Sequence, residues 1–410
     1  MKKSPRYIAI AILEEILEAG AYANIALRRS LAENALPPRD NAFITELVNE
    51  TLRNLIQIDH TINQYSKTPL DKQKPFIRNL LRISVCQLNH LEKIPHHAAI
   101  NEAVNLAKSR KLMGLAGFIN GLLRNISRGG VPDHKDIALK YSYPKWLVKK
   151  LDTWGIDPTA FCQNSHTPPP VTIYPNTPQV VEALAKDNIE TTDLGKFLIL
   201  NKPGDITQLT AFKQGLFFVM DPGAIQAVEA ANPQPGETIL DLCAAPGGKT
   251  FAMAMAGASV QAFDIHPHRV QLISQTAKRL KLKNVTAKVQ DATIQNLNLI
   301  KTADTILLDV PCTGFGTIRK NPEIKYTRTQ EDIIDLQKVQ RDILQTAAQY
   351  VKPGGKIVYC TCTITTEENM DNVNHFLNSH PNFTLAHHEQ TLPSPTNDAF
   401  FVAVIKSLDI

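Results

Sequence analysis

The stretch Asp241-Leu-Cys-Ala-Ala-Pro-Gly-Gly-Lys-Thr250 predicts a turn from a buried strand into a ligand-binding loop. It overlaps the apolar, partly β-branched run 238–242, and a helix-compatible run, 249–255, follows its two adjacent glycines. In a parallel α/β sheet, such a strand, glycine-rich turn and helix let a ligand approach backbone N–H groups at the carboxyl edge of the sheet. The turn alone is equally compatible with an ordinary strand-to-helix connection, so residues elsewhere must decide.

The end of this stretch, Gly248-Lys249-Thr250, looks like the end of a phosphate-binding P-loop. That motif requires a glycine five positions before its second glycine, and Cys243 stands there. Pro246 also lacks the N–H group that a phosphate cradle would use. The sequence therefore favours a ligand with a ribose and few or no phosphates over a nucleoside triphosphate.

Strand and helix patterns alternate after the loop, which predicts a doubly wound, mostly parallel, Rossmann-like α/β sheet. The later strands end at Asp264, at Asp291, at Asp309 followed by Cys312, and at Cys362. Because the carboxyl ends of parallel strands line one crevice, we expect these residues to meet at one rim. Asp264 also has the spacing from the glycine-rich turn that is typical of a carboxylate bound to ribose hydroxyls.

The end of the chain adds a helix start and a sheet edge. Thr365 and Glu368 have the spacing of a capping box, which predicts that a helix begins there. The apolar runs 383–386 and 399–405 predict two strands paired antiparallel at the edge of the sheet.

Two cysteines beside a carboxylate indicate covalent chemistry. An activated thiol is strongly nucleophilic and suits addition to an electron-poor ring carbon. A lone cysteine is more often a buried apolar filler. The turn Pro311-Cys312, and Cys362 between two threonines at a strand end, are poor positions for a filler.

The composition is that of a globular protein with two or three domains. The 410 residues are 43% hydrophobic and 20% charged. We expect a cytoplasmic protein without a signal peptide or a membrane span. The six cysteines are too scattered for a disulfide framework and lack the paired spacing of a zinc site, so we expect no metal.

Positive charge is concentrated in the front of the chain. Residues 1–150 carry 23 Lys and Arg against 13 Asp and Glu, although the net charge of the whole chain is only +5. A basic front third indicates a polyanionic partner, while an ordinary solvated surface remains the alternative.

The patterns divide the chain into four parts. Residues 1–132 show only helical periodicity, with helices starting at Ser4-Pro5 and at about residues 43, 75, 98 and 115. We expect a helical linker at 133–165, a small α/β subdomain at 166–214 and the Rossmann-like domain at 215–410.

Two resemblances extend these expectations. Residues 99–108 and 117–124 resemble the helical RNA-binding module of the antitermination factor NusB, over about residues 5 to 130. The loop at 241–250, Leu308-Asp-Val-Pro-Cys-Thr-Gly314 and Tyr359-Cys-Thr-Cys362 resemble the RNA 5-methylcytosine methyltransferases, over about residues 215 to 406. The fusion of the two is similar to a bacterial branch that methylates small-subunit ribosomal RNA.

The methyltransferase resemblance implies S-adenosylmethionine as the methyl donor. Asp264 would bind the ribose, Asp291 would contact the adenine, and Asp309 would lie next to the donor and bind the cytosine edge. The loop would contact the donor through Cys243, Ala244, Ala245, Pro246, Gly247, Gly248 and Lys249.

The same resemblance assigns Cys362 as the nucleophile that adds to cytosine C6 and Cys312 as the residue that assists product release. DNA cytosine methyltransferases attack from a Pro-Cys motif, so Cys312 remains the rival nucleophile. Cys360 has no implied role and is interpreted as packing. The turn Met220-Asp-Pro-Gly223 departs from the family pattern, and so does Gln290, where glycine is common.

The implied partner is small-subunit ribosomal RNA, protein-free or early in assembly, bound by a monomer. Arg319, Lys320 and Lys325, just after Cys312, are the candidates for phosphate contacts beside the pocket. A DNA or small-molecule methyltransferase, and a non-catalytic RNA-binding assembly factor, are the alternative functions.

Overall fold

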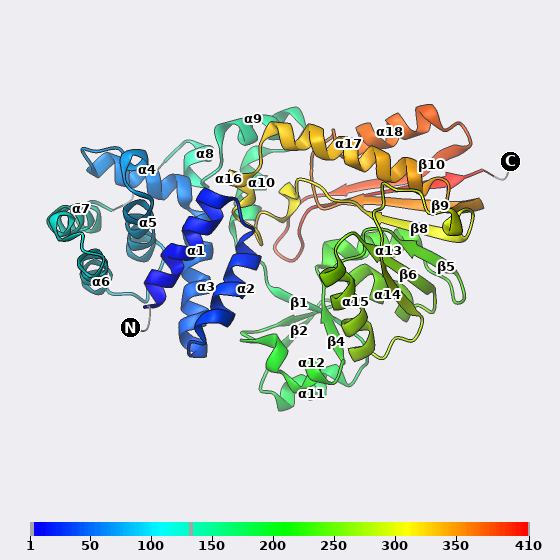
Figure 1. Ribbon diagram of the computed structural model, residues 1–410, viewed down its shortest axis with the longest axis horizontal. Helices are drawn as coiled ribbons and strands as arrows, with labels where there is room; N and C mark the ends of the chain where they lie inside the picture. Colours follow the sequence, from blue (N-terminus) through cyan, green and yellow to red (C-terminus); the bar gives the residue numbers. More distant parts are fainter. Residues whose placement is uncertain (1–3, 131–133, 409–410) are drawn as a thin grey trace. The chain divides into compact units, whose positions relative to one another are not determined.

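The computed structural model describes residues 4–130 and 134–408, which form two compact units (Figure 1). The N-terminal unit comprises Met1–His166 together with Ile318–Thr327. The C-terminal unit comprises Thr167–Thr317 and Arg328–Ile410. The expected boundary between residues 132 and 133 lies outside the described residues. No helix of the described residues is long and apolar enough to cross a membrane.

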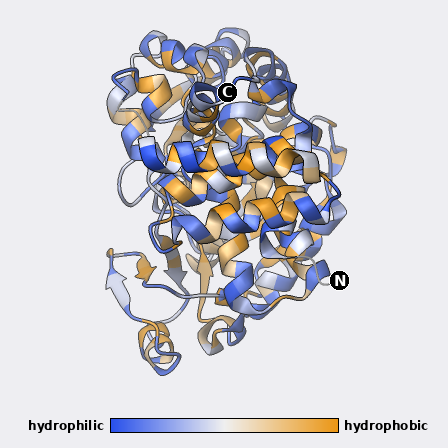
Figure 2. Ribbon diagram, turned by 90° about the vertical axis from the view of Figure 1, so that its left-hand side faces the viewer, coloured by the Kyte–Doolittle hydropathy of each residue, from blue (hydrophilic) through white to orange (hydrophobic). Residues whose placement is uncertain are grey.

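The described part of the N-terminal unit is all-helical, as predicted. Its first helix, α1, begins where the Ser4 hydroxyl accepts a hydrogen bond from the Tyr7 N–H, and it ends at Gly20, whose φ is 71°. The helices within residues 5–129 bury one apolar core, and the helices of the whole described unit have amphipathic surfaces (Figure 2). They are α1 (Pro5–Ala19), α2 (Ala23–Asn34), α3 (Pro38–Arg53), α4 (Leu55–Tyr65), α5 (Pro75–Asn89), α6 (His96–Ser109), α7 (Ala116–Gly129), α8 (Ile137–Lys140), α9 (Lys145–Thr153), α10 (Pro158–His166) and α16 (Ile324–Thr327).

Residues 134–166 differ from the linker that the sequence predicts. Helices α8 to α10 belong to the N-terminal unit, and so does Ile318–Thr327, which is more than 150 residues further along the chain. The Tyr326 hydroxyl donates to the Ser142 carbonyl at 3.1 Å, which ties this later segment to the turn after α8. The described part of the expected linker therefore belongs to the folded N-terminal unit.

A small antiparallel sheet opens the C-terminal unit. Its strand order is β2-β3-β1-β4, and it packs against helices α11 (Val180–Lys186) and α12 (Thr210–Lys213). The last strand lies beyond the subdomain end expected at residue 214, because it pairs with the first strand of the same sheet. The strands are β1 (Val171–Pro175), β2 (Thr191–Asp193), β3 (Leu198–Leu200) and β4 (Phe217–Val219).

The large sheet has seven strands in the order β10-β11-β9-β8-β5-β6-β7. Strands β9, β8, β5, β6 and β7 run parallel, while β11 and β10 pair antiparallel at one edge. The sequence predicts both features. The strands are β5 (Thr238–Asp241), β6 (Ser259–Asp264), β7 (Val285–Val289), β8 (Ala303–Asp309), β9 (Val351–Thr361), β10 (Phe383–Thr391) and β11 (Phe400–Ser407).

Helices cover both faces of this sheet, because successive strand residues point to opposite faces. Ile239 packs among the apolar residues of α13 (Ile225–Ala231), α14 (Gly248–Met255) and α15 (Pro267–Arg279). Its neighbour Leu240 packs with α17 (Gln330–Ala347) and α18 (Met370–Ser379) on the other side. Burial on both faces leaves the carboxyl ends of the strands to form the site.

Candidate active site at the carboxyl ends of the parallel strands

A cavity of about 280 Å³ lies where β5, β6, β7 and β8 end. The structure brings Asp264, Asp291 and Asp309 together around it, as the sequence predicts from their strand-end positions. Of the expected loop contacts, Cys243 and Ala245 line it. The other lining residues are Leu242, Ile265, His266, Arg269, Gln290, Ala292, Thr293, Pro311, Val339 and Ile343.

The loop between β5 and α14 is held from below by buried contacts. Gly247 has φ 107°, and a Cβ there would collide with the Phe251 ring, so only glycine fits. The Thr250 hydroxyl donates to Asp241 Oδ2 at 2.6 Å. Burial raises the pKa of Asp241 to about 7, against the lowering effect of that hydrogen bond.

The five expected donor contacts that do not line the cavity lie in the same loop. Ala244 donates its N–H to the Phe263 carbonyl at 2.8 Å, which joins the loop to the end of β6. Pro246 follows a cis peptide bond. A Cβ at Gly248 would lie 3.7 Å from Met220 Cγ, so the unusual Met220–Gly223 turn packs against the loop. The remaining positions are Gly247 and Lys249.

Local turns fix the carboxylates of Asp264, the last residue of β6, and of Asp291, two residues after β7. Asp264 Oδ1 accepts the His266 N–H at 2.9 Å. Asp291 Oδ1 accepts from both the N–H and the hydroxyl of Thr293, at 2.9 and 2.7 Å. Since each turn engages only one carboxylate oxygen, each carboxylate has a second oxygen for donors on a ligand.

Asp309 is paired with Lys249, a contact that the sequence reasoning does not anticipate. Lys249 Nζ lies 2.6 Å from Asp309 Oδ2, and the lysine side chain is only 13% exposed. Burial by itself would lower the pKa of Lys249, but the attraction of Asp309 reverses this and raises it. The Cys360 thiol, wholly buried, lies 3.8 Å from Asp309 Oδ1 and packs in the core on the α13–α15 face.

The two cysteines expected to act on the substrate are neighbours, although 50 positions separate them. Cys312 Sγ lies 3.4 Å from Cys362 Sγ. The hydrogen bond with Cys362 and burial together raise the pKa of Cys312. A thiol that keeps its proton is a proton donor, so the pair combines a thiol acid with a second sulfur in direct contact.

Sequence reasoning missed several residues that shape the cavity. His266 and Arg269 stand at the start of α15, directly after the Asp264 strand end. Their position shortly after a carboxylate at a strand end could have indicated that they line the cavity. Val339 and Ile343 come from α17, far along the chain, and helical periodicity alone does not indicate that they reach this cavity.

Two of the three residues expected to contact RNA are buried in the N-terminal unit. Arg319 and Lys325 are each 1% exposed. Lys325 Nζ donates to the Arg53 and Tyr141 carbonyls, at 2.7 and 3.3 Å. The prediction of phosphate contacts from these two residues is therefore wrong for this structure, because both side chains are buried. Lys320 is exposed.

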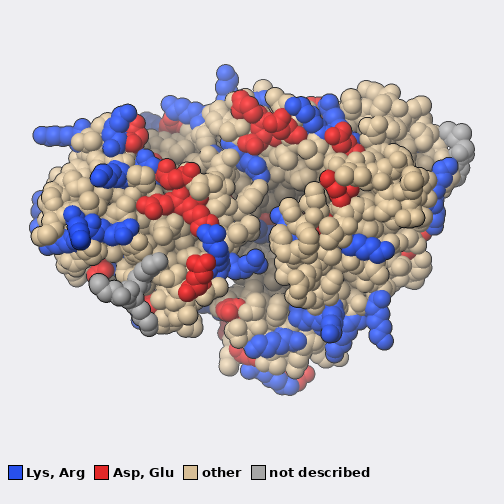
Figure 3. Space-filling model, in the orientation of Figure 1, with Lys and Arg blue, Asp and Glu red and all other residues tan. Residues whose placement is uncertain are grey.

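Other basic residues do face outward. On the face shown in Figure 3, Lys and Arg side chains gather at the left-hand end, where Figure 1 places α6 and α7. Those helices carry the exposed residues Lys108, Lys111, Arg124 and Arg128 on or beside them. Arg82, in contrast, is buried in an ion pair with Asp59 at 2.6 Å.

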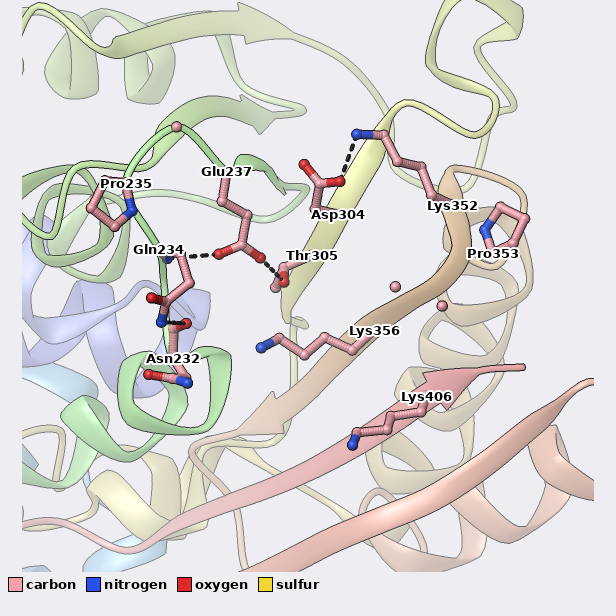
Figure 4. A pocket seen from close by; sticks show the side chains of 13 residues that line it. Asn232, Gln234, Pro235, Glu237, Asp304, Thr305, Lys352, Pro353, Lys356 and Lys406 are labelled. Carbon is pink, nitrogen blue, oxygen red and sulfur yellow. Dashed lines mark hydrogen bonds and ion pairs between the residues drawn. The ribbon is translucent and has the colours of Figure 1, made fainter. Parts of the chain in front are cut away.

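A second, open groove of about 730 Å³ lies at the opposite ends of β5, β8 and β9 (Figure 4). Lys356 and Lys406 extend into it from directly opposed positions on β9 and β11, and Lys352 pairs with Asp304 at 2.6 Å. Since the cavity lined by the three carboxylates lies at the carboxyl ends of the parallel strands, this groove is not part of the candidate active site.

Two known protein families match this chain, over two separate stretches. Residues 228–405 match the family model described as 16S rRNA methyltransferase RsmB/F, and residues 3–128 match the NusB family. The chain is 36% identical to the probable ribosomal RNA small subunit methyltransferase B of Bacillus subtilis, over 93% of this chain and 90% of that protein. This chain belongs to the ribosomal RNA small subunit methyltransferase B family.

Other similarities agree with membership of this methyltransferase family. The ribosomal RNA small subunit methyltransferase B of Cronobacter sakazakii is 33% identical, over 98% of this chain and 99% of that one. The crystal structure of the protein PH0851 matches with a TM-score of 0.82 and 27% identity, over 99% of this chain and all of that one. The N-terminal unit contains the NusB-family domain that the sequence predicts.

Proposed function

We propose that this protein methylates C5 of a cytosine in small-subunit ribosomal RNA, through a covalent bond between Cys362 and C6 of the base. The observation that carries the proposal is the contact of the Cys312 and Cys362 thiols, 3.4 Å apart, in one unit with a cavity lined by three carboxylates. The names of the two relatives, which describe ribosomal RNA small subunit methyltransferases, support ribosomal RNA as the substrate.

The cavity suits S-adenosylmethionine, which supplies an electrophilic methyl group when it is bound. Asp264 would accept hydrogen bonds from the ribose hydroxyls, and Asp291 from the amino group of the adenine. Ile265, Val339 and Ile343 give the cavity apolar walls that suit the adenine ring. Asp309 would lie at the border between donor and cytosine.

The cysteines would divide the chemistry on the base between them. Cytosine C5 is a weak nucleophile, and addition of the Cys362 thiolate to C6 makes it electron-rich enough to accept a methyl group. Asp309 would contact the cytosine edge and help to protonate N3, and its pairing with Lys249 fixes its orientation. The C5 proton is then lost to a base, and the Cys362 sulfur leaves C6 and restores the aromatic ring; Cys312, in contact with that sulfur, would assist this release as a proton donor to it.

Mutation of each cysteine separates nucleophile from assistant. In Cys312→Ala, the adduct forms but is released slowly, so a covalent protein–RNA species should accumulate after incubation with donor and RNA. In Cys362→Ala, no adduct should form. Denaturing gel electrophoresis with labelled RNA measures both. An adduct in Cys362→Ala and none in Cys312→Ala would make Cys312 the nucleophile.

The class of substrate is tested by transfer of labelled methyl groups. We expect protein-free small-subunit RNA to accept label, with bisulfite sequencing placing it at one cytosine in a single-stranded or hairpin-loop position. Such a base can leave its stack and expose C5 and C6. Label in DNA but not in this RNA would contradict the proposal, and no transfer to either would favour a non-catalytic assembly factor.

A further inference from the structure

Glu368 lies between the two loops that carry the cysteines. Its side chain is wholly buried, in the turn that precedes α18. Its carboxylate accepts the Thr313 N–H at 2.9 Å and the Thr313 hydroxyl at 2.5 Å. It also accepts the Thr365 hydroxyl at 2.8 Å and Gln340 Nε2 at 3.0 Å. Four donors from three segments therefore meet on one carboxylate.

The partners of Glu368 stand next to the thiols. Thr313 directly follows Cys312, and Thr365 is three residues after Cys362. The Thr313 and Thr363 hydroxyls are themselves 2.7 Å apart, which links the residue after one cysteine to the residue after the other. Glu368 therefore binds Thr313 in the Cys312 loop and Thr365 in the Cys362 loop.

Packing alone does not account for a charged side chain at this position. Burial raises the pKa of Glu368, which shows that the surroundings oppose its charge, while the hydrogen bonds favour it. Every partner named above is a donor, and an ionised carboxylate is the side chain that accepts from all of them. An apolar residue would fill the space but would leave buried donors without acceptors.

We propose that Glu368 is a positioning residue that fixes the Cys312 and Cys362 thiols relative to each other. The role of Glu368 in holding the two thiols rests on the hydrogen bonds described above. The effect of Glu368 on turnover rests in addition on the proposed function. Replacement of Glu368 by glutamine keeps the size but puts an NH₂ donor in a place surrounded by donors. The two loops would then separate and the sulfurs would lose their contact.

The proximity of the thiols can be measured without the reaction. Diamide oxidises two neighbouring thiols to a disulfide and is itself reduced to the hydrazine, which takes up the two electrons and two protons. We expect the initial rate of the Cys312–Cys362 disulfide, followed by peptide mass mapping, to fall about tenfold in Glu368→Gln, because close fixed partners react as if at high local concentration.

Asn284→Ala is the matched control in the same unit. Its side chain donates to the Ala254 and Ala258 carbonyls, both at 2.7 Å, so the substitution also removes two hydrogen bonds but far from the cysteine loops along the chain. We expect the oxidation rate to remain that of the wild type, although the melting temperature falls. Equal oxidation rates in Glu368→Gln, Asn284→Ala and the wild type would overturn the proposal.

Thr313→Val provides a second variant if Glu368→Gln does not fold, because it keeps the side-chain shape and removes only one donor. We expect a smaller fall in the same oxidation rate, and an unchanged rate would again contradict the proposal. With ribosomal RNA as substrate, kcat should fall in parallel while the KM for the methyl donor stays constant. If Cys362→Ala still forms an RNA adduct, the proposed function fails, yet the oxidation rates still test the role of Glu368.

Discussion

Lys249 in the C-terminal unit and Lys325 in the N-terminal unit are two largely buried lysines with opposite surroundings. Lys249 contacts a carboxylate, and its pKa is raised. Lys325 Nζ donates to two backbone carbonyls and lies 4.7 Å from the centre of the Tyr143 ring. The pKa of Lys325 is lowered, mainly by burial and to a smaller extent by repulsion from Arg53. The difference indicates that the partner, more than the depth of burial, decides whether the pKa of a buried lysine is raised or lowered.

The largest expected effect comes from removing the charge of Lys249. Lys249→Met leaves Asp309 without its partner, and loss of one member of a buried ion pair typically costs about 3–5 kcal/mol of unfolding free energy. Urea denaturation measures the loss, and methyl transfer should fall with it. The exposed pair of Lys196 and Glu229 supplies the control, because Lys196→Met should cost at most about 1 kcal/mol.

A double substitution sharpens the interpretation of that result. The double variant Lys249→Met with Asp309→Asn removes both charges. Its loss of unfolding free energy should therefore be smaller than the sum of the losses in the two single variants. Additive losses would mean that the two side chains do not act as a pair.

The pH dependence of stability should separate the two lysines by sign. Because the pKa of Lys325 is lowered in the folded state, the unfolded chain binds more protons, and this lysine makes the protein more stable as pH rises towards the unfolded pKa of about 10.4. Lys249, whose pKa is raised, contributes stability that is complete below about 10.4 and is lost above it.

Urea midpoints of the wild type and Lys325→Met between neutral pH and pH 10 test this difference. The wild type should gain stability relative to Lys325→Met as the pH rises, whereas the difference between the wild type and Lys249→Met should stay flat in the same range. A wild-type advantage over Lys325→Met that shrinks with rising pH would contradict the lowered pKa.

The smallest effect on stability is expected at Lys320, which lies between these buried groups in sequence but is exposed. Lys320→Ala should change the unfolding free energy by less than about 0.5 kcal/mol. If it contacts a phosphate, the slope of log binding constant against log salt should fall by about 1. An unchanged salt slope, measured by fluorescence anisotropy with ribosomal RNA, would remove the last of the three expected RNA contacts.

The sequence predicted the meeting of three carboxylates at one cavity better than it predicted the segment after Cys312, for a physical reason. Asp264, Asp291 and Asp309 end parallel strands, and the geometry of such a sheet places them at one rim wherever the loops go. Arg319 and Lys325 lie in a segment without regular periodicity, and nothing local indicates that it enters the core of the other unit. Their charge suggested solvent and phosphate, whereas both side chains are buried, and the Lys325 ammonium contacts a backbone carbonyl and an aromatic ring.

Glu368 illustrates a second limit. Its spacing from Thr365 predicts a capping box, and the two residues do form hydrogen bonds, with Glu368 N donating to the Thr365 hydroxyl at 3.3 Å. The helix itself begins two residues later, at Met370, and the carboxylate turns towards Thr313. A local pattern indicates a local bond, but a partner 55 positions away can be found only when the fold is known.

The segment Ile318–Thr327 also limits how this protein can be divided. It is encoded within the methyltransferase half, yet Glu323 accepts the Ala23 N–H at 3.0 Å and Arg53 donates to the Arg319 carbonyl at 3.2 Å. A chimera that takes only residues 4–166 from a relative would combine that helical unit with the segment 318–327 of this chain, against which it does not normally pack. An exchange of the N-terminal unit between relatives must therefore transfer two separate pieces of the gene together. One encodes the front of the chain, and the other comprises the ten codons of Ile318–Thr327.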